Sequence, residues 1–235
     1  MNASVSTLPA ARFIFAAFAT LAVVVSGGEH VAAQTAAARG SVATAGKSLQ
    51  ASSLLGNYMA GRLARSNHDS AGASEFYRRA LERAPGDPNV VENSFMAEAA
   101  EGHFARASML ARRVIENQPS HRLAHMWLAT DAMKSRQFAA SNEHLVKSSG
   151  GGPIGELTAT LGRAWVRLAE GNSAGAIEIL RNFRIAEAAQ NYVRYHRALV
   201  SDLAGRRGDA TRELEAVFRQ DPRTPRDRAH RVLGL

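Results

Sequence analysis

Between short polar turns, small and apolar side chains recur along most of the chain at a fixed interval. Pro85, Pro119 and Pro153 are 34 residues apart, and Pro222 follows 69 residues later, as two intervals lengthened by one residue would place it. A second series of small residues has steps of 34, 34, 35 and 34: Ala73, Ala107, Ser141, Ala176 and Ala210. Self-similarity at this period is typical of stacked helical hairpins, because each hairpin buries its apolar face only against the next one.

Within each interval the pattern predicts a helix, a tight turn, a second helix and a stop. In the first interval we expect helices at residues 54–66 and 71–83, around a turn at residues 67–69. Pro85 and Pro88 then end the second helix, because proline lacks an amide hydrogen and clashes with the preceding helical turn. Further turns are expected at residues 102–103, 135–137, 171–172 and 205–206, and three of them contain the glycine that a helix C-terminus favours.

The first interval also contains Gly61, Ala73, Tyr77 and Ala80, small residues around one aromatic ring. With the 34-residue period they resemble the tetratricopeptide repeat over residues 54–222, as five units of approximately 54–87, 88–121, 122–156, 157–190 and 191–224. The resemblance implies an all-α superhelical solenoid of about five helical hairpins. We expect residues 225–235 to form a short capping helix, since a solenoid must cover its last apolar face.

The sequence departs from the repeat pattern at several places. Phe95 and Phe183 stand where small residues are expected, and the fourth unit lacks a closing proline. Two interpretations of the fourth unit therefore stay open. Either the chain breaks near Glu187, or residues 185–200 form one long helix.

The N-terminus has the pattern of a secretory signal peptide over residues 1–33. Arg12 precedes an apolar run at residues 13–25, and Val31-Ala32-Ala33 fits a cleavage site for signal peptidase. The apolar run is shorter than the roughly 20 residues that span a membrane, although an uncleaved signal anchor is the alternative. The small polar residues at 34–53 predict a flexible linker.

Composition limits the chemistry of the chain. It contains no cysteine, which excludes a lipoprotein anchor, disulfides and thiolate sites. The net charge is +8, and 26 of the 29 basic residues are arginine. A basic balance suits nucleic acid, anionic lipid or an acidic protein. The arginines are scattered, however, and a GC-rich coding bias explains them better than a nucleic-acid surface.

No motif predicts catalysis, a cofactor or a metal site. Residues 40–48 resemble a phosphate-binding loop but have five residues between the glycines, where the motif requires four. His121 and His125 share a helix face, but no third ligand is evident, so we expect one solvated and one packed histidine. Ser201 and Asp202 belong to no recognisable catalytic triad. We therefore expect no enzyme activity.

The resemblance implies that the first helix of each hairpin lines a concave groove for a peptide or a partner helix. Aromatic residues, methionine and arginine are enriched at such surfaces. The groove candidates are Tyr58, Arg62, Arg65, Met96, Met126, Met133, Trp165 and Tyr195. The carboxylate clamp of some family members requires Lys and Asn on successive helices, and here only Asn93 matches it.

Together these features predict a protein- or peptide-binding scaffold of the bacterial cell envelope. We expect periplasmic export, with secretion or signal anchoring as alternatives, and no transmembrane helix in the mature chain. One alternative function is a basic module that binds anionic envelope polymer or lipid headgroups through scattered arginines. A second is an enzyme whose site is assembled from distant residues.

Overall fold

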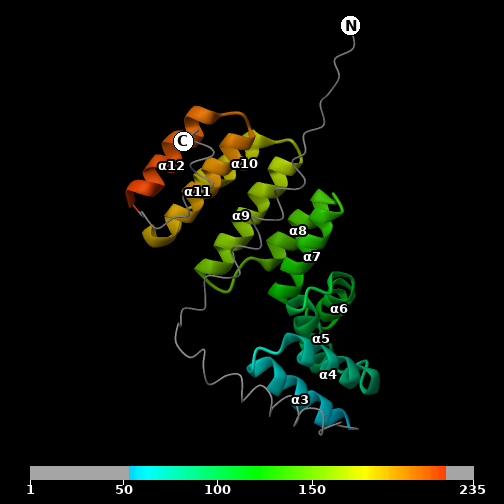
Figure 1. The fold of residues 1–235 in the computed structure, drawn as a ribbon. Coiled ribbons are helices and arrows are strands. Elements are labelled where there is room, and N and C mark those ends of the chain that lie inside the picture. The colour runs from blue at the N-terminus through cyan, green and yellow to red at the C-terminus, as the bar shows by residue number, and fades with distance from the viewer. Residues whose placement is uncertain (1–52, 221–235) are drawn as a thin grey trace. The chain divides into compact units, whose positions relative to one another are not determined.

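The computed structural model describes residues 53–220, and this part of the chain consists of ten α-helices without a strand (Figure 1). In chain order the helices are α3 (Leu54–Ser66), α4 (Ser70–Arg83), α5 (Pro88–Ala100), α6 (Phe104–Asn117), α7 (Arg122–Lys134), α8 (Phe138–Ser148), α9 (Pro153–Ala169), α10 (Ser173–Asn182), α11 (Glu187–Leu203) and α12 (Arg207–Gln220). The all-α expectation is confirmed.

Short polar side chains begin several of these helices by accepting hydrogen bonds from free amides of the first turn. Ser53 Oγ accepts from the amide of Gly56 at 3.0 Å, and Asp69 Oδ1 accepts from the amide of Gly72 at 2.8 Å. Pro88 is the first residue of α5, where its missing amide hydrogen has no cost. The two helices predicted for the first repeat are confirmed as α3 and α4, with α4 starting one residue earlier than expected.

The turns inside the hairpins use left-handed backbone. Gly102 and Gly171 have φ values of 78° and 85°, as the glycine signal predicted. In the first and third hairpins the same conformation falls on His68 (φ 57°) and Arg136 (φ 58°), where a side chain makes it less favourable.

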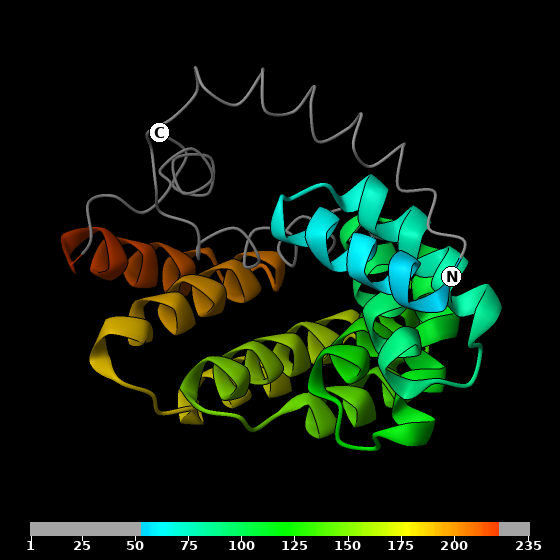
Figure 2. The same cartoon turned by 90° about the horizontal axis from the view of Figure 1, so that it is seen from below.

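The described helices form two compact units, each larger than a single repeat, that divide within α7. Below, the first unit ends at Leu128 and the second unit begins at Ala129. In the first unit, α3 to α6 pack pairwise in chain order (Figure 2). A Cβ on Gly61 would lie 3.0 Å from the ring of Tyr77, so a larger residue at this position would crowd the contact of α3 with α4. Ala73 and Tyr77 are fully buried in the same contact, which we call the interlock of α3 and α4.

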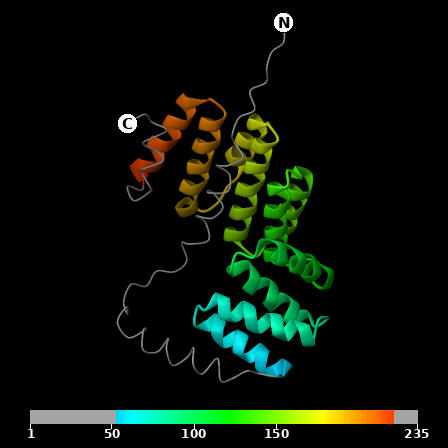
Figure 3. The ribbon, with the colours of Figure 1, turned by 45° about the vertical axis from the view of Figure 1, so that its right-hand side comes forward.

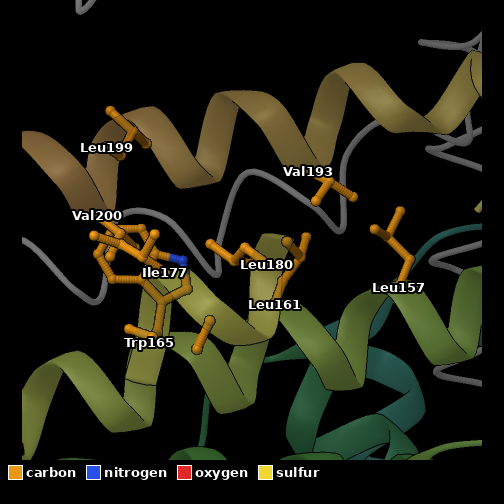
Figure 4. Packing of buried hydrophobic residues seen from close by; sticks show 10 residues of the cluster. Leu157, Leu161, Trp165, Ile177, Leu180, Val193, Leu199 and Val200 are labelled. Carbon is orange, nitrogen blue, oxygen red and sulfur yellow. The ribbon is translucent and has the colours of Figure 1, made fainter. Parts of the chain in front are cut away.

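The second unit contains the end of α7 and helices α8 to α12 (Figure 3). Its main core lies between α9, α10 and α11, where Leu161 and Trp165 face Leu180 and Val200 (Figure 4). A smaller cluster of Ala198 and Leu214 joins α11 to α12.

Three expectations need correction or a choice. Residues 187–200 do belong to one long helix, because α11 runs without interruption from Glu187 to Leu203. The break in the chain precedes it, between the end of α10 at Asn182 and Glu187. Pro153 does not follow the third hairpin as a closing residue but is the first residue of α9, so this helix begins four residues before the expected fourth unit. Phe95 is buried in the core of the first unit, where it fills space that a small residue would leave empty.

Four predictions lie outside the described residues. They are the signal peptide at residues 1–33, nearly all of the linker at 34–53, the segment at 40–48 that resembles a phosphate-binding loop, and the capping helix at 225–235. Among residues 53–220, no helix combines the length and the apolar character needed to cross a membrane.

Candidate peptide-binding surface

One exposed face of α3 carries three of the groove candidates. Tyr58, Arg62 and Arg65 are spaced by four and three residues, so they share one side of the helix. Asn93 on α5 joins this face from the next hairpin. Its Nδ2 donates to the Tyr58 hydroxyl at 3.2 Å, and its Oδ1 accepts from Arg65 Nη1 at 3.1 Å. We call these four residues the α3–α5 surface.

A buried aromatic ring supports this surface from behind. Tyr77 on α4 meets Tyr58 edge to face, with ring centroids 5.8 Å apart and planes at 72°. Burial raises the pKa of Tyr77, while the charges of Arg65 and Arg62 oppose the shift. Within the described residues, the buried Tyr77 hydroxyl has no hydrogen-bond partner. Tyr58 is thus held by Tyr77 on one side and Asn93 on the other, and its orientation is set before a ligand arrives.

The two arginines leave the surface positively charged. Both side chains belong to exposed residues, and no carboxylate of the described part of the chain lies within ion-pair distance of Arg62 or Arg65. The nearest acidic residue along α5 is Glu92, which is occupied by other partners. Its carboxylate accepts from Gln118 Nε2 at 3.0 Å and contacts His121 Nε2 at 3.3 Å.

Both histidines of the pair are packed, so the expectation of one solvated histidine is wrong: the side chain of His121 is only 12% exposed. His121 Nδ1 accepts from the amide of Ala124 at 3.1 Å and so caps the start of α7. His125 is buried, and its Nε2 donates to the Pro119 carbonyl at 2.8 Å. Across residues 53–220, no cluster of three or more His, Asp or Glu side chains is arranged to hold a metal ion.

The remaining candidates of the first unit lie closer to its core. Met96 packs against the cluster around Phe95, and Met126 is half-buried on α7. Trp127 is also half-buried: its Nε1 donates to Ser108 Oγ at 3.0 Å, and its ring lies 4.8 Å from that of Phe104. Neither methionine belongs to the α3–α5 surface.

In the second unit, three candidates gather around one core cluster instead of lining an open face. Trp165 is only 4% exposed, and it points into the core that α9 shares with α10 and α11 (Figure 4). Met133 and Tyr195 pack against the same cluster. A ligand could reach Trp165 only after these neighbours moved, so its packing favours a role in stability. A groove role for it stays a prediction that only binding data can test.

Sequence reasoning did not place Asn93 among the groove candidates, although it joins two of them. The sequence does contain a signal for Asn93, because it matches a position of the carboxylate clamp on the first helix of the second hairpin. The other clamp residues are missing, so this match by itself does not predict a binding site. Hydrogen bonds between hairpins depend on how close two side chains lie in space, and the spacing of residues along the sequence does not give that distance.

The comparisons with known proteins agree on the fold. No protein-family model and no curated protein matches the chain. Among solved structures, a tetratricopeptide repeat protein from Parabacteroides merdae has a TM-score of 0.60 and 16% identity, over 77% of this chain and 74% of that one. TTC0263, a thermophilic TPR protein of Thermus thermophilus, has a TM-score of 0.52 and 16% identity, over 78% and 100%. MamA from Desulfovibrio magneticus has a TM-score of 0.60 and 13% identity, over 72% and 96%.

Identities this low indicate a shared arrangement of helices and transfer no residue's role. The paired helices, the left-handed turns and the interlock of Gly61 with Tyr77 agree with these matches. The described part of the chain therefore has the fold of the tetratricopeptide repeat proteins.

Proposed function

We propose that this protein is a scaffold that binds an extended acidic segment of a partner protein on the α3–α5 surface. The observation that carries the proposal is the position of Asn93, which bonds both Tyr58 and Arg65 and so links two hairpins. A binding surface whose side chains are already ordered loses less conformational entropy when the partner arrives.

The residue types of the surface favour a protein ligand. Tyrosine and arginine are enriched among the residues that contribute most to protein interfaces. Arg62 and Arg65 have no carboxylate partner among the described residues, so an acidic partner group would supply the missing negative charge. The surface suits a carboxylate-bearing segment better than a neutral one.

We also propose that the protein acts in the bacterial cell envelope after export. The support is the sequence pattern of residues 1–33, with its apolar run and its small-residue cleavage site. Secretion to the medium and signal anchoring remain the alternatives to a periplasmic location.

Affinity capture from envelope extracts with the full mature chain tests the binding proposal. The test variant is Arg62→Ala, and the matched control is Arg83→Ala, because Arg83 is also exposed but lies at the end of α4. We expect Arg62→Ala to lower the yield of the captured partner about tenfold, and Arg83→Ala to change it less than twofold.

The captured partner is then tested as synthetic acidic segments in a direct titration. Affinity that falls with salt and with Arg62→Ala, but not with Arg83→Ala, supports the proposal. Equal losses in both variants would instead favour the alternative of an anionic polymer or lipid headgroup bound through scattered arginines. Unchanged capture by Arg62→Ala and by Tyr58→Ala would overturn the proposed surface.

A further inference from the structure

A separate cleft of about 640 Å³ lies among the last three described helices, α10, α11 and α12. These helices are neighbours in the second unit (Figure 3). Each contributes residues at helical spacing, so one side of each helix faces the cleft. The lining residues are Ile177 and Arg181 of α10, Arg194, Arg197 and Ser201 of α11, and Asp209, Arg212, Glu213 and Ala216 of α12. The cleft shares no residue with the α3–α5 surface.

The lining carries an excess of positive charge. It contains four arginines and two carboxylates, which leaves a net charge of +2. Both carboxylates are already paired with arginine. Glu213 accepts from Arg197 Nη2 at 2.5 Å, and Asp209 is paired with Arg212 and with Arg206. The two acidic residues therefore hold Arg197 and Arg212 in place.

Part of this charge is removed from water. The side chain of Arg197 is only 18% exposed, and its Nε is buried without a hydrogen-bond partner in the described part of the chain. Ser201, one turn further along α11, is also buried, and Ile177 provides an apolar wall. Electrostatic attraction is stronger in such surroundings than at an open surface, because less water screens it.

We propose that this cleft binds a phosphate monoester. A phosphate monoester carries about two negative charges at neutral pH, opposite in sign to the excess of arginine over carboxylate in the lining. The planar guanidinium group bonds phosphate oxygens in pairs, so the arginines of the lining suit this ligand. The volume lies within the roughly 300–1,000 Å³ of small-ligand sites, so the site admits a phosphorylated small molecule or a lipid headgroup.

Titration of the full mature chain with glycerol 3-phosphate, followed by calorimetry, tests the site. The test variant is Arg181→Gln combined with Arg212→Gln, because both arginines line the cleft and both are exposed, so neither supports the core. The control is Arg219→Gln, which removes one positive charge from α12 outside the cleft and so matches each single change of the double variant. We expect the double variant to raise the Kd at least about tenfold, and Arg219→Gln to change it less than twofold.

Far-UV circular dichroism and the melting temperature of each variant separate loss of binding from loss of folding. If the double variant unfolds, Arg181→Gln alone is used, and a threefold or larger rise in Kd is then expected. Equal affinity in the wild type and in the folded test variant would overturn the site. Malonate that binds as tightly as glycerol 3-phosphate would overturn the assignment to phosphate.

A second experiment identifies the source of the phosphate group. Vesicles of phosphatidylcholine with about one tenth phosphatidic acid carry the same phosphate monoester on a membrane, and pure phosphatidylcholine vesicles are the control. Vesicle binding that the double variant loses and Arg219→Gln retains supports a lipid headgroup. Binding of glycerol 3-phosphate without vesicle binding supports a soluble ligand. Vesicle binding that both variants lose equally, without binding of glycerol 3-phosphate, would overturn the proposal.

Discussion

The indole N–H of Trp165 on α9 donates a hydrogen bond to Nδ1 of His196 on α11, across 2.9 Å. The two rings meet edge to face, with centroids 5.9 Å apart and planes at 84°. Because Nδ1 accepts this bond, the ring proton of His196 stands on Nε2 and the imidazole is neutral. Burial lowers the pKa of His196 from 6.5 to about 4. This aromatic pair thus adds a hydrogen bond to the apolar core that joins the fourth hairpin to the fifth.

Truncation of this pair should destabilise the protein. Trp165→Ala removes a large buried side chain and should lower the free energy of unfolding by about 3–5 kcal/mol. Trp165→Phe keeps most of the volume but leaves Nδ1 of His196 buried without its donor, which should cost about 1–3 kcal/mol. Chemical denaturation measures both, with the exposed Tyr192→Ala on α11 as control. A Trp165→Ala variant of unchanged stability but impaired partner binding would instead support a groove role.

Stability should also depend on pH through His196. Above pH 6.5 the histidine is neutral in both the folded and the unfolded state, so it does not lower the free energy of unfolding there. Between pH 6.5 and about 4 the unfolded state binds a proton that the folded state does not bind. The free energy of unfolding should therefore fall as the pH falls, by roughly 3 kcal/mol from this residue alone. Denaturation series across this pH range provide the measurement.

The matched variant for this effect is His196→Asn, whose amide oxygen keeps an acceptor near the indole and does not titrate. Its stability should vary less than that of the wild type between pH 6.5 and 4. Parallel profiles for the two proteins would show that other groups cause the acid sensitivity.

The interlock of α3 and α4 should tolerate no larger side chain at Ala73. This residue is 1% exposed and packs with Tyr77, so Ala73→Leu should overpack the contact at a cost of about 1–3 kcal/mol. Ala71→Leu on the same helix is the control, because Ala71 is exposed. Ser74, the residue after Ala73, cannot serve as the control, because it is buried and donates to Glu98 Oε1 at 3.1 Å. Equal melting temperatures for the two leucine variants would contradict the packing.

The turn of the third hairpin offers a stabilising change. Arg136 is exposed and adopts a φ of 58°, a conformation that costs a residue with a side chain roughly 1–2 kcal/mol. Arg136→Gly should raise the free energy of unfolding by about 0.5–1 kcal/mol, since the greater freedom of glycine in the unfolded chain offsets part of the gain. Ser135→Gly, at a neighbouring residue without positive φ, should be neutral or destabilising. Thermal melts that rank the two variants the other way would refute this explanation.

Export is tested at the N-terminus. If residues 1–33 are a signal peptide, protein purified from the envelope fraction should begin at Gln34. N-terminal sequencing measures this directly. An intact Met1 in the envelope fraction would favour a signal anchor, and an intact Met1 in the cytosol would rule out export.

The sequence by itself determined the repeat length, the class of fold and the bounds of several helices. These features follow from local chemistry, because proline, the turn glycines and small residues at fixed spacing act within one hairpin. The bounds of α3 and the left-handed turns at Gly102 and Gly171 could therefore be predicted from a single chain.

Only the tertiary structure decided which faces of the helices are covered. Helical spacing shows that residues share a face, but the packed neighbour decides whether that face is open. On α3 the face of Tyr58 and Arg62 stays accessible, whereas the face of α9 that carries Trp165 is covered by α10 and α11. The bond of Asn93 to Arg65 and the arginine cleft of α10 to α12 likewise join residues of separate helices. The physical reason is that burial and long-range hydrogen bonds depend on the packing between helices, whereas helix formation depends mainly on residues within one or two turns.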